Sequence, residues 1–163
     1  MYERGNMPKA KIKSFQTNVA GVTFENRQNI IKKKCKIGDK VELIRKYDNK
    51  YDENAIKVCL SDRTQIGYLS QECAAVIVRK RNNKNGANQA AFISNIGLVD
   101  QENIYFVQLT VIEWDNTVNS LDAKQYYDTE KEIALDNIKS KSSGCLSITA
   151  LIIIITGILL YLI

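Results

Sequence analysis

The chain of 163 residues has no histidine, a single proline, and four widely spaced cysteines without a CxxC pair. Without imidazole and without paired thiols, a zinc site and a histidine base are not expected. The sequence also lacks a glycine-rich phosphate loop, a Walker A motif and a serine nucleophile elbow. These absences predict a protein that is not an enzyme and that uses no metal and no cofactor.

A secretory signal is also missing from the N-terminus. The first 13 residues are polar and basic, with none of the apolar stretch that such signals contain. A disulfide framework is therefore not expected. The simplest interpretation of the four cysteines, Cys35, Cys59, Cys73 and Cys145, is that they are reduced thiols, buried or without a role.

Charge is divided unevenly along the chain. Residues 1–99 contain 19 Lys and Arg against 9 Asp and Glu, a net charge of +10, whereas residues 100–138 contain 2 against 9, a net charge of −7. A basic domain attracts polyanions at long range. Lysine-rich coding without a function accounts for the same excess, and charge alone favours neither interpretation.

The C-terminal end is the one long apolar run. No charged residue occurs over 142–163, and 145–163 consists mostly of Leu and Ile. Nineteen helical residues span about 28 Å, close to the thickness of a bilayer core. A buried core element is the alternative, but the run is too long for a strand and has no apolar partner of matching size. We therefore predict a transmembrane helix, with 145–163 in contact with lipid.

The flanking charges indicate how this helix would be oriented. Lys139 and Lys141 precede it and nothing charged follows it. The positive-inside rule then places the N-terminal domain in the cytoplasm, as in a single-pass, tail-anchored membrane protein.

Hydrophobic periodicity predicts a mainly β domain with short helices, of the α+β class. Asn26 is expected to cap the first helix and Ser70 the second. The acidic stretch 47–53 lacks calcium-loop spacing and is predicted to be a turn leading into the next strand. Strands are expected over 18–23, 40–46, 55–60, 65–69, 90–98 and 104–113, and helices over 26–34 and 70–79.

These elements divide the chain into four parts: a basic arm, a β-barrel domain, an acidic linker that is either a solvated helix or a loose stalk, and the anchor. Their boundaries are 1–14, 15–115, 116–141 and 142–163.

Three stretches of the sequence resemble a known family. The runs GVTFENRQNII, VELIRKYDNKYDENAIKV and QIGYL follow one another in the order and spacing of the HIRAN domain, over residues 15–114. The two signature stretches are Tyr51-Asp52-x-Asn54-Ala55-Ile56 and Gln65-Ile66-Gly67-Tyr68-Leu69.

The resemblance implies an OB-like small β-barrel that holds the 3′ end of single-stranded DNA. In that family an aromatic residue and a Tyr-Asp pair bind the terminal nucleotide, and Phe24, Tyr51 and Asp52 occupy these positions here. Tyr68 and Lys50 complete the expected nucleic-acid site. The chain departs from the family pattern at Thr23, which replaces an arginine, at Glu25, which replaces an aromatic residue, and at Tyr68, which replaces a histidine.

Two functions remain open from the sequence. The first is a membrane-tethered, non-catalytic module for single-stranded nucleic acid, DNA 3′ ends above all. The second is a membrane-anchored protein-interaction adaptor that has lost nucleic-acid binding. Six cations, Lys32, Lys33, Lys34, Arg45, Lys46 and Lys50, either compensate for Thr23 and Glu25 or only solvate the surface.

Overall fold

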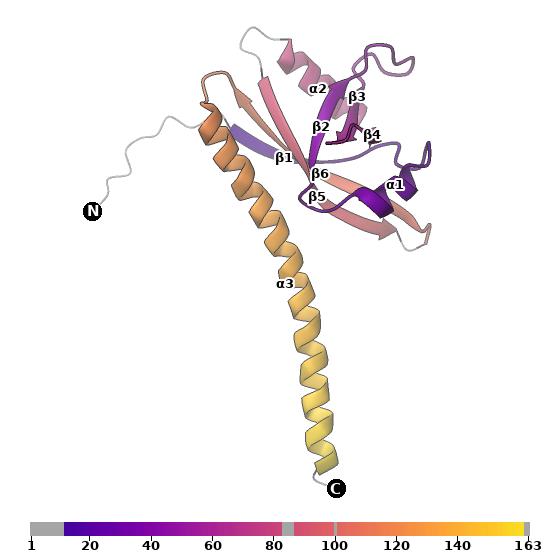
Figure 1. Ribbon diagram of the computed structural model, residues 1–163, viewed down its shortest axis with the longest axis vertical. Coiled ribbons are helices and arrows are strands. Elements are labelled where there is room, and N and C mark those ends of the chain that lie inside the picture. The colour runs from indigo at the N-terminus through magenta and orange to yellow at the C-terminus, as the bar shows by residue number, and fades with distance from the viewer. Residues whose placement is uncertain (1–11, 83–86, 100, 162–163) are drawn as a thin grey trace, which may run out of the picture.

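The computed structural model describes residues 12–82, 87–99 and 101–161, with side chains described as far as residue 140. Its strands form one antiparallel sheet in the order β1-β6-β5-β2-β3-β4, accompanied by helices (Figure 1). The elements are β1 (Ile12–Asn18), α1 (Arg27–Lys34), β2 (Lys40–Arg45), β3 (Ile56–Leu60), β4 (Gln65–Tyr68), α2 (Gln71–Arg81), β5 (Ala87–Val99), β6 (Ile104–Asp115) and α3 (Ser120–Tyr161).

The sheet is curled so that its two outer strands meet. Ala20, just after β1, and Tyr68, at the end of β4, exchange two backbone hydrogen bonds of 2.8 and 3.0 Å. A Cβ on Gly67 would overlap Val19 Cγ1 and the Ala20 carbonyl oxygen, so this approach requires a glycine. The result is the mainly β half-barrel expected of an OB-like fold.

The inside of the half-barrel holds the main hydrophobic core. Val107, Leu109 and Val111 alternate along β6 and are fully buried there. Ile77 on α2 and Ile31 on α1 are buried against the same cluster. The two helices thus cover openings of the half-barrel that the strands leave.

The second face of the long hairpin β5–β6 is also partly buried. Phe92 and Ile112 are fully buried, although neither belongs to the main core. The cover is α3, which packs on β5 and places the ring of Tyr127 5.4 Å from that of Phe92, edge to face. Ala123, one turn earlier on α3, is buried as well.

Several predicted elements are confirmed. The meander β2-β3-β4 and the hairpin β5–β6 pair as expected. Ser70 caps α2, because its Oγ accepts a hydrogen bond of 3.3 Å from the Cys73 amide. Both strands of the hairpin are longer than predicted, and a bulge between Ile93 and Asn95 lets β5 bend with the curled sheet.

Two local predictions are wrong. The first strand runs over Ile12–Asn18 rather than 18–23, because β6 pairs along this whole stretch and Gly21, at φ 70°, turns the chain away. It therefore begins inside the predicted basic arm. Asn26 precedes α1 but has φ 61° and makes no side-chain cap to the helix backbone.

The region predicted to be a solvated helix or a loose stalk is the first part of α3, and it is not free of the domain. A Cβ on Gly38 would lie 3.2 Å from Lys131 Cε and 3.3 Å from Leu135 Cδ2, so the loop before β2 contacts α3 closely. The helix continues without a break from this region into the segment predicted as the anchor, over 42 residues in all.

The predicted membrane span, 142–163, falls outside the residues whose side chains are described. Within the part of the chain that is described, no helix is both long and apolar enough to cross a membrane.

Candidate functional site

A groove with a volume of about 840 Å³ lies where three segments meet: the loop after β1, the loop between β2 and β3, and the end of β4. Four of the five predicted site residues line it, namely Phe24, Tyr51, Asp52 and Tyr68. Lys50, the fifth, is not part of the lining. The complete lining is Ala20, Gly21, Phe24, Glu25, Arg27, Asn49, Tyr51, Asp52, Ala55, Tyr68, Leu69, Ser70 and Gln71.

Phe24 lies on a tightly wound loop. Gly21, Glu25 and Asn26 all have positive φ, and the Arg27 amide donates to the Phe24 carbonyl at 3.0 Å. Two consecutive non-glycine residues at positive φ are uncommon and indicate a loop held by its surroundings. The loop keeps the Phe24 ring 66% exposed beside the groove, where it is available for stacking.

Tyr51 and Asp52 are held by side-chain to backbone hydrogen bonds. The Asn49 side-chain oxygen accepts from the amides of Tyr51 at 2.8 Å and Asp52 at 3.2 Å. Asp52 Oδ1 in turn accepts from the Asn54 amide at 2.8 Å. These bonds confirm the turn predicted from the sequence, and they leave the Tyr51 side chain 92% exposed.

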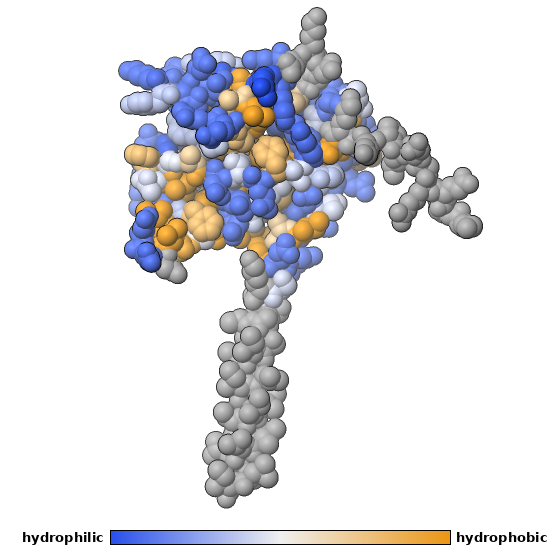
Figure 2. Space-filling view, turned by 180° about the vertical axis from the view of Figure 1, so that it is seen from behind, coloured by the Kyte–Doolittle hydropathy of each residue, from blue (hydrophilic) through white to orange (hydrophobic). Residues whose placement is uncertain are grey.

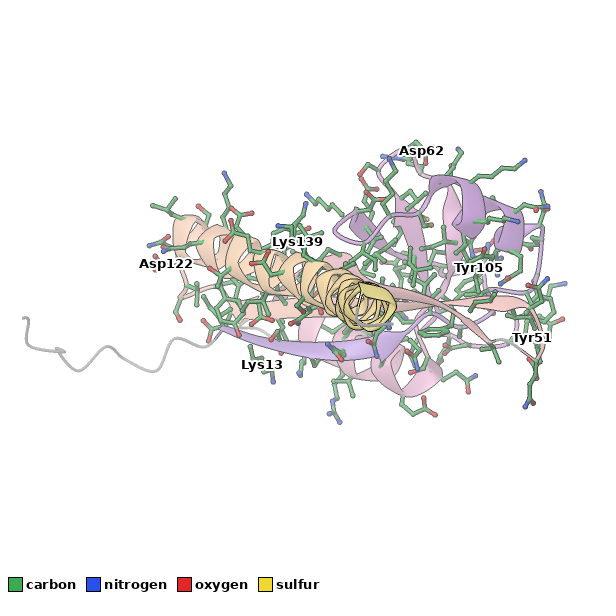
Figure 3. The ribbon with its side chains drawn as sticks, turned by 90° about the horizontal axis from the view of Figure 1, so that it is seen from below. Lys13, Tyr51, Asp62, Tyr105, Asp122 and Lys139 are labelled. Carbon is green, nitrogen blue, oxygen red and sulfur yellow. The ribbon has the colours of Figure 1, made fainter. Side chains whose placement is uncertain are left out.

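The same loop shows how the groove is oriented on the molecule. Tyr51 lies at the opposite end of the domain from Asp122 on α3 (Figure 3).

Within the described residues, Asp52 Oδ2 has no hydrogen-bond partner, so one oxygen of this carboxylate is available to accept a hydrogen bond.

Asp48, the first acidic residue of this stretch, does not line the groove. It pairs with Lys46 at 2.8 Å, and this hydrogen bond lowers the pKa of the Asp48 carboxyl and raises the pKa of Lys46. Asp48 and Asp52 are therefore engaged in separate interactions.

Sequence reasoning did not identify Arg27 as part of the groove. The residue is only 3% exposed, and its guanidinium lies 5.4 Å from the centre of the Tyr68 ring. It donates to the Gly21 carbonyl at 2.8 Å and pairs with Glu25. An arginine at the start of a polar helix is ordinarily exposed, and only its closeness to Phe24 in the sequence pointed to the site.

None of the six cations considered either as compensation for Thr23 and Glu25 or as a solvated surface lines the groove. Lys33 and Lys34 line a different cavity, and Lys34 pairs with Asp62 at 2.9 Å. Arg45 stacks on Tyr47 and donates to the Glu53 carbonyl at 2.7 Å. Arg27 is therefore the one cation among the groove's described lining residues.

Two solved structures are similar to this chain, and the first of them shows a similar fold. A structure of the HIRAN domain of human HLTF is similar at a TM-score of 0.50 and 21% identity, covering 74% of this chain and 88% of that one. A protein from Lactobacillus plantarum gives a TM-score of 0.43 and 20% identity, covering 63% and 98%. A search of curated proteins found no match.

The family model matches at the level of sequence. The HIRAN domain model covers residues 12–108, more than half of the chain, and includes every residue that lines the groove. Domains of this kind are in general nucleic-acid-binding modules. On this match, the chain belongs to the HIRAN domain family.

Proposed function

We propose that the chain is a non-catalytic module that binds single-stranded nucleic acid, with DNA 3′ ends as its target, and that its C-terminal segment tethers it to a membrane. The observation that carries the binding proposal is the convergence of Phe24, Tyr51 and Asp52 on one groove, from two loops that are far apart in the sequence.

The aromatic residues supply affinity for any base. Phe24 and Tyr51 are both largely exposed, from separate loops beside one groove. Stacking of a base on an aromatic ring contributes about 1–3 kcal/mol and depends little on the base. Single exposed rings are common on protein surfaces, but two exposed rings at one groove favour a stacking function.

Asp52 supplies a preference for the end of a strand. Its Oδ2 is free to accept a hydrogen bond from a 3′ hydroxyl. A 3′ phosphate, or a continuing phosphodiester, would bring a negative charge close to this carboxylate and would be repelled.

The experiment compares two labelled single strands of identical sequence, one ending in a 3′ hydroxyl and the other in a 3′ phosphate, titrated with the full chain in detergent micelles. We expect binding to the hydroxyl end to be tighter by about tenfold, which corresponds to about 1.4 kcal/mol. Asp52→Ala removes this preference.

Asp52→Asn is the matched control, because it retains an acceptor oxygen but removes the charge. Asp52→Asn should bind both strands, and its affinity for the strand with the 3′ phosphate should rise most relative to the wild type. An end preference that is unchanged in Asp52→Ala would refute the role of Asp52.

One observation favours the second function, a membrane-anchored protein-interaction adaptor. The lining of the groove holds two carboxylates, Glu25 and Asp52, against the single guanidinium of Arg27. A groove of this charge is a weak attractor of phosphate. Binding in the same titration that is weak, indifferent to the strand end and insensitive to salt would support the adaptor.

The membrane part of the proposal rests on the sequence of 142–163 and on Lys139 and Lys141 before it. The length of the apolar run suits a bilayer core, and the flanking lysines favour a cytoplasmic domain. Such a tether would keep a bound strand close to the membrane surface.

A further inference from the structure

Arg27 is a buried cation whose hydrogen bonding is incomplete. Its side chain is 4% exposed. Nη1 donates to the Gly21 carbonyl and Nη2 to the Glu25 carboxylate, whereas Nε is buried without any partner in the described structure. An unsatisfied buried donor is unfavourable, and natural proteins keep few of them.

Glu25 is a weakly held counter-charge. Its side chain is 74% exposed, and it contacts Arg27 through a single oxygen, Oε2. Its backbone has φ 53°, which is unfavourable for a glutamate. Breaking the bond from such an exposed carboxylate to Arg27 costs little free energy, because water replaces that bond.

Nε and Nη2 of Arg27 form one edge of the guanidinium. Nε–H and one Nη2–H point in parallel and match two oxygens of a single phosphate or carboxylate group. Glu25 engages only Nη2 of this edge. The edge is therefore half used in the free protein.

This guanidinium is held in position within the groove. It lies over the Tyr68 ring at 5.4 Å, and a Cβ on Gly21 would lie 3.2 Å from its Nη1. Both Arg27 and Glu25 line the groove together with Phe24. An anion that displaced Glu25 would thus lie next to the aromatic ring proposed to stack a base.

We propose that Glu25 and Arg27 form a carboxylate latch, in which a phosphate group of the bound strand displaces Glu25 and takes both Nε and Nη2. This rests on the proposed function, since the phosphate is that of the nucleic acid. In the free protein Glu25 neutralises Arg27. The latch makes the site selective for a nucleotide over a free phosphate. Because Glu25 lies on the same loop and competes for Arg27, a phosphate displaces it only when a base of the same strand stacks on the aromatic ring.

The test uses the full chain in micelles, a labelled single strand with a 3′ hydroxyl, and the variants Glu25→Gln, Arg27→Gln and the double variant. Glu25→Gln should tighten binding by about fivefold, since it removes the competitor. Arg27→Gln should weaken binding by about tenfold or more. On the Arg27→Gln background, Glu25→Gln should give no gain.

Glu132→Gln is the matched control, because it makes the same change of net charge at an exposed position of α3 outside the groove. A gain in Glu25→Gln that is no larger than the gain in Glu132→Gln overturns the latch. Arg27→Lys covers the case in which Arg27→Gln does not fold. A lysine retains the charge but lacks the two parallel N–H donors of the guanidinium. Binding by Arg27→Lys that equals binding by the wild type would therefore also overturn the proposal.

A chain that binds no oligonucleotide at all would refute the proposed function without deciding on the latch, and a second readout covers that case. The Arg27 Nε–H resonance of Glu25→Gln is followed by NMR during titration with inorganic phosphate. A saturable shift in Glu25→Gln that is weaker in the wild type supports the latch. An unmoved resonance overturns it.

Discussion

At the scale of single residues, burial sets the properties of the described thiols. Cys35, beside the loop that follows α1, is half-buried, and burial together with Asp39 and Asp62 raises its pKa to about 11. Burial is also the main cause that raises the pKa of Cys59 and of Cys73. These thiols are free in the structure, as expected from the sequence, and their raised pKa values make them poor nucleophiles.

We expect Cys35 to resist alkylation near neutral pH. With its pKa raised to about 11, the thiolate form, which is the reactive one, is a minor species at pH 8 and becomes major only as the pH passes the pKa. Iodoacetamide labelling at pH 8, followed by mass spectrometry, should be about 200-fold slower for Cys35 in the native chain than in urea, given an unfolded pKa near 8.5. Equal rates in the two states would contradict this expectation.

At the scale of elements, α3 is part of the domain as well as the connection to the C-terminal segment. Tyr127 packs edge to face on Phe92, and Leu135 contacts the loop at Gly38. The hydroxyl of Tyr127 is buried and has no hydrogen-bond partner among the described residues. The ring of Tyr127, rather than its hydroxyl, is therefore expected to stabilise the docked helix.

Tyr127→Ala should lower the free energy of unfolding by about 2 kcal/mol, because it removes a half-buried ring and an aromatic pair. Tyr127→Phe is the control. It retains the ring and removes an unsatisfied hydroxyl, so its stability should equal or exceed that of the wild type. Urea denaturation measures both. An equal loss of unfolding free energy in the two variants would show that the hydroxyl, and not the ring, stabilises the docked helix.

At the scale of the whole molecule, the groove and the C-terminal segment lie apart. The loop that holds Tyr51 is at the far end of the domain from the start of α3, and α3 runs on beyond the sheet (Figures 1 and 3). Hydrophilic and hydrophobic side chains alternate over the face of the domain in Figure 2. Scattered apolar residues are usual for a soluble surface, so this face gives no sign of lipid attachment, and the proposed tether rests on the C-terminal segment.

The full chain should therefore float with liposomes in a density gradient, whereas a chain that ends after residue 140 should remain at the bottom. The truncated chain retains Tyr127 and Leu135, so its domain should melt at the same temperature as that of the full chain. Flotation of the truncated chain, or failure of the full chain to float, would refute the proposed tether.

Elements whose signals are local could be predicted from the sequence. The alternation over β2, β3 and β4, the hairpin β5–β6 and the Ser70 cap were all predicted, because strand periodicity and capping depend on neighbours in the chain. The motifs around Tyr51 and Tyr68 likewise indicated the family, because each of them is a short continuous stretch of the chain.

Features that depend on residues far apart in the chain could not be predicted from the sequence, because they arise only when the chain is folded. The junction of Ala20 with Tyr68 curls the sheet and brings the loop after β1 beside the end of β4, where both line the groove. The packing of α3 on Phe92 was equally unforeseen, because an acidic helix without a strong apolar stripe gives no local sign of a docked face. Burial of a charged residue such as Arg27 follows from the surrounding fold and has no signature in the adjacent sequence.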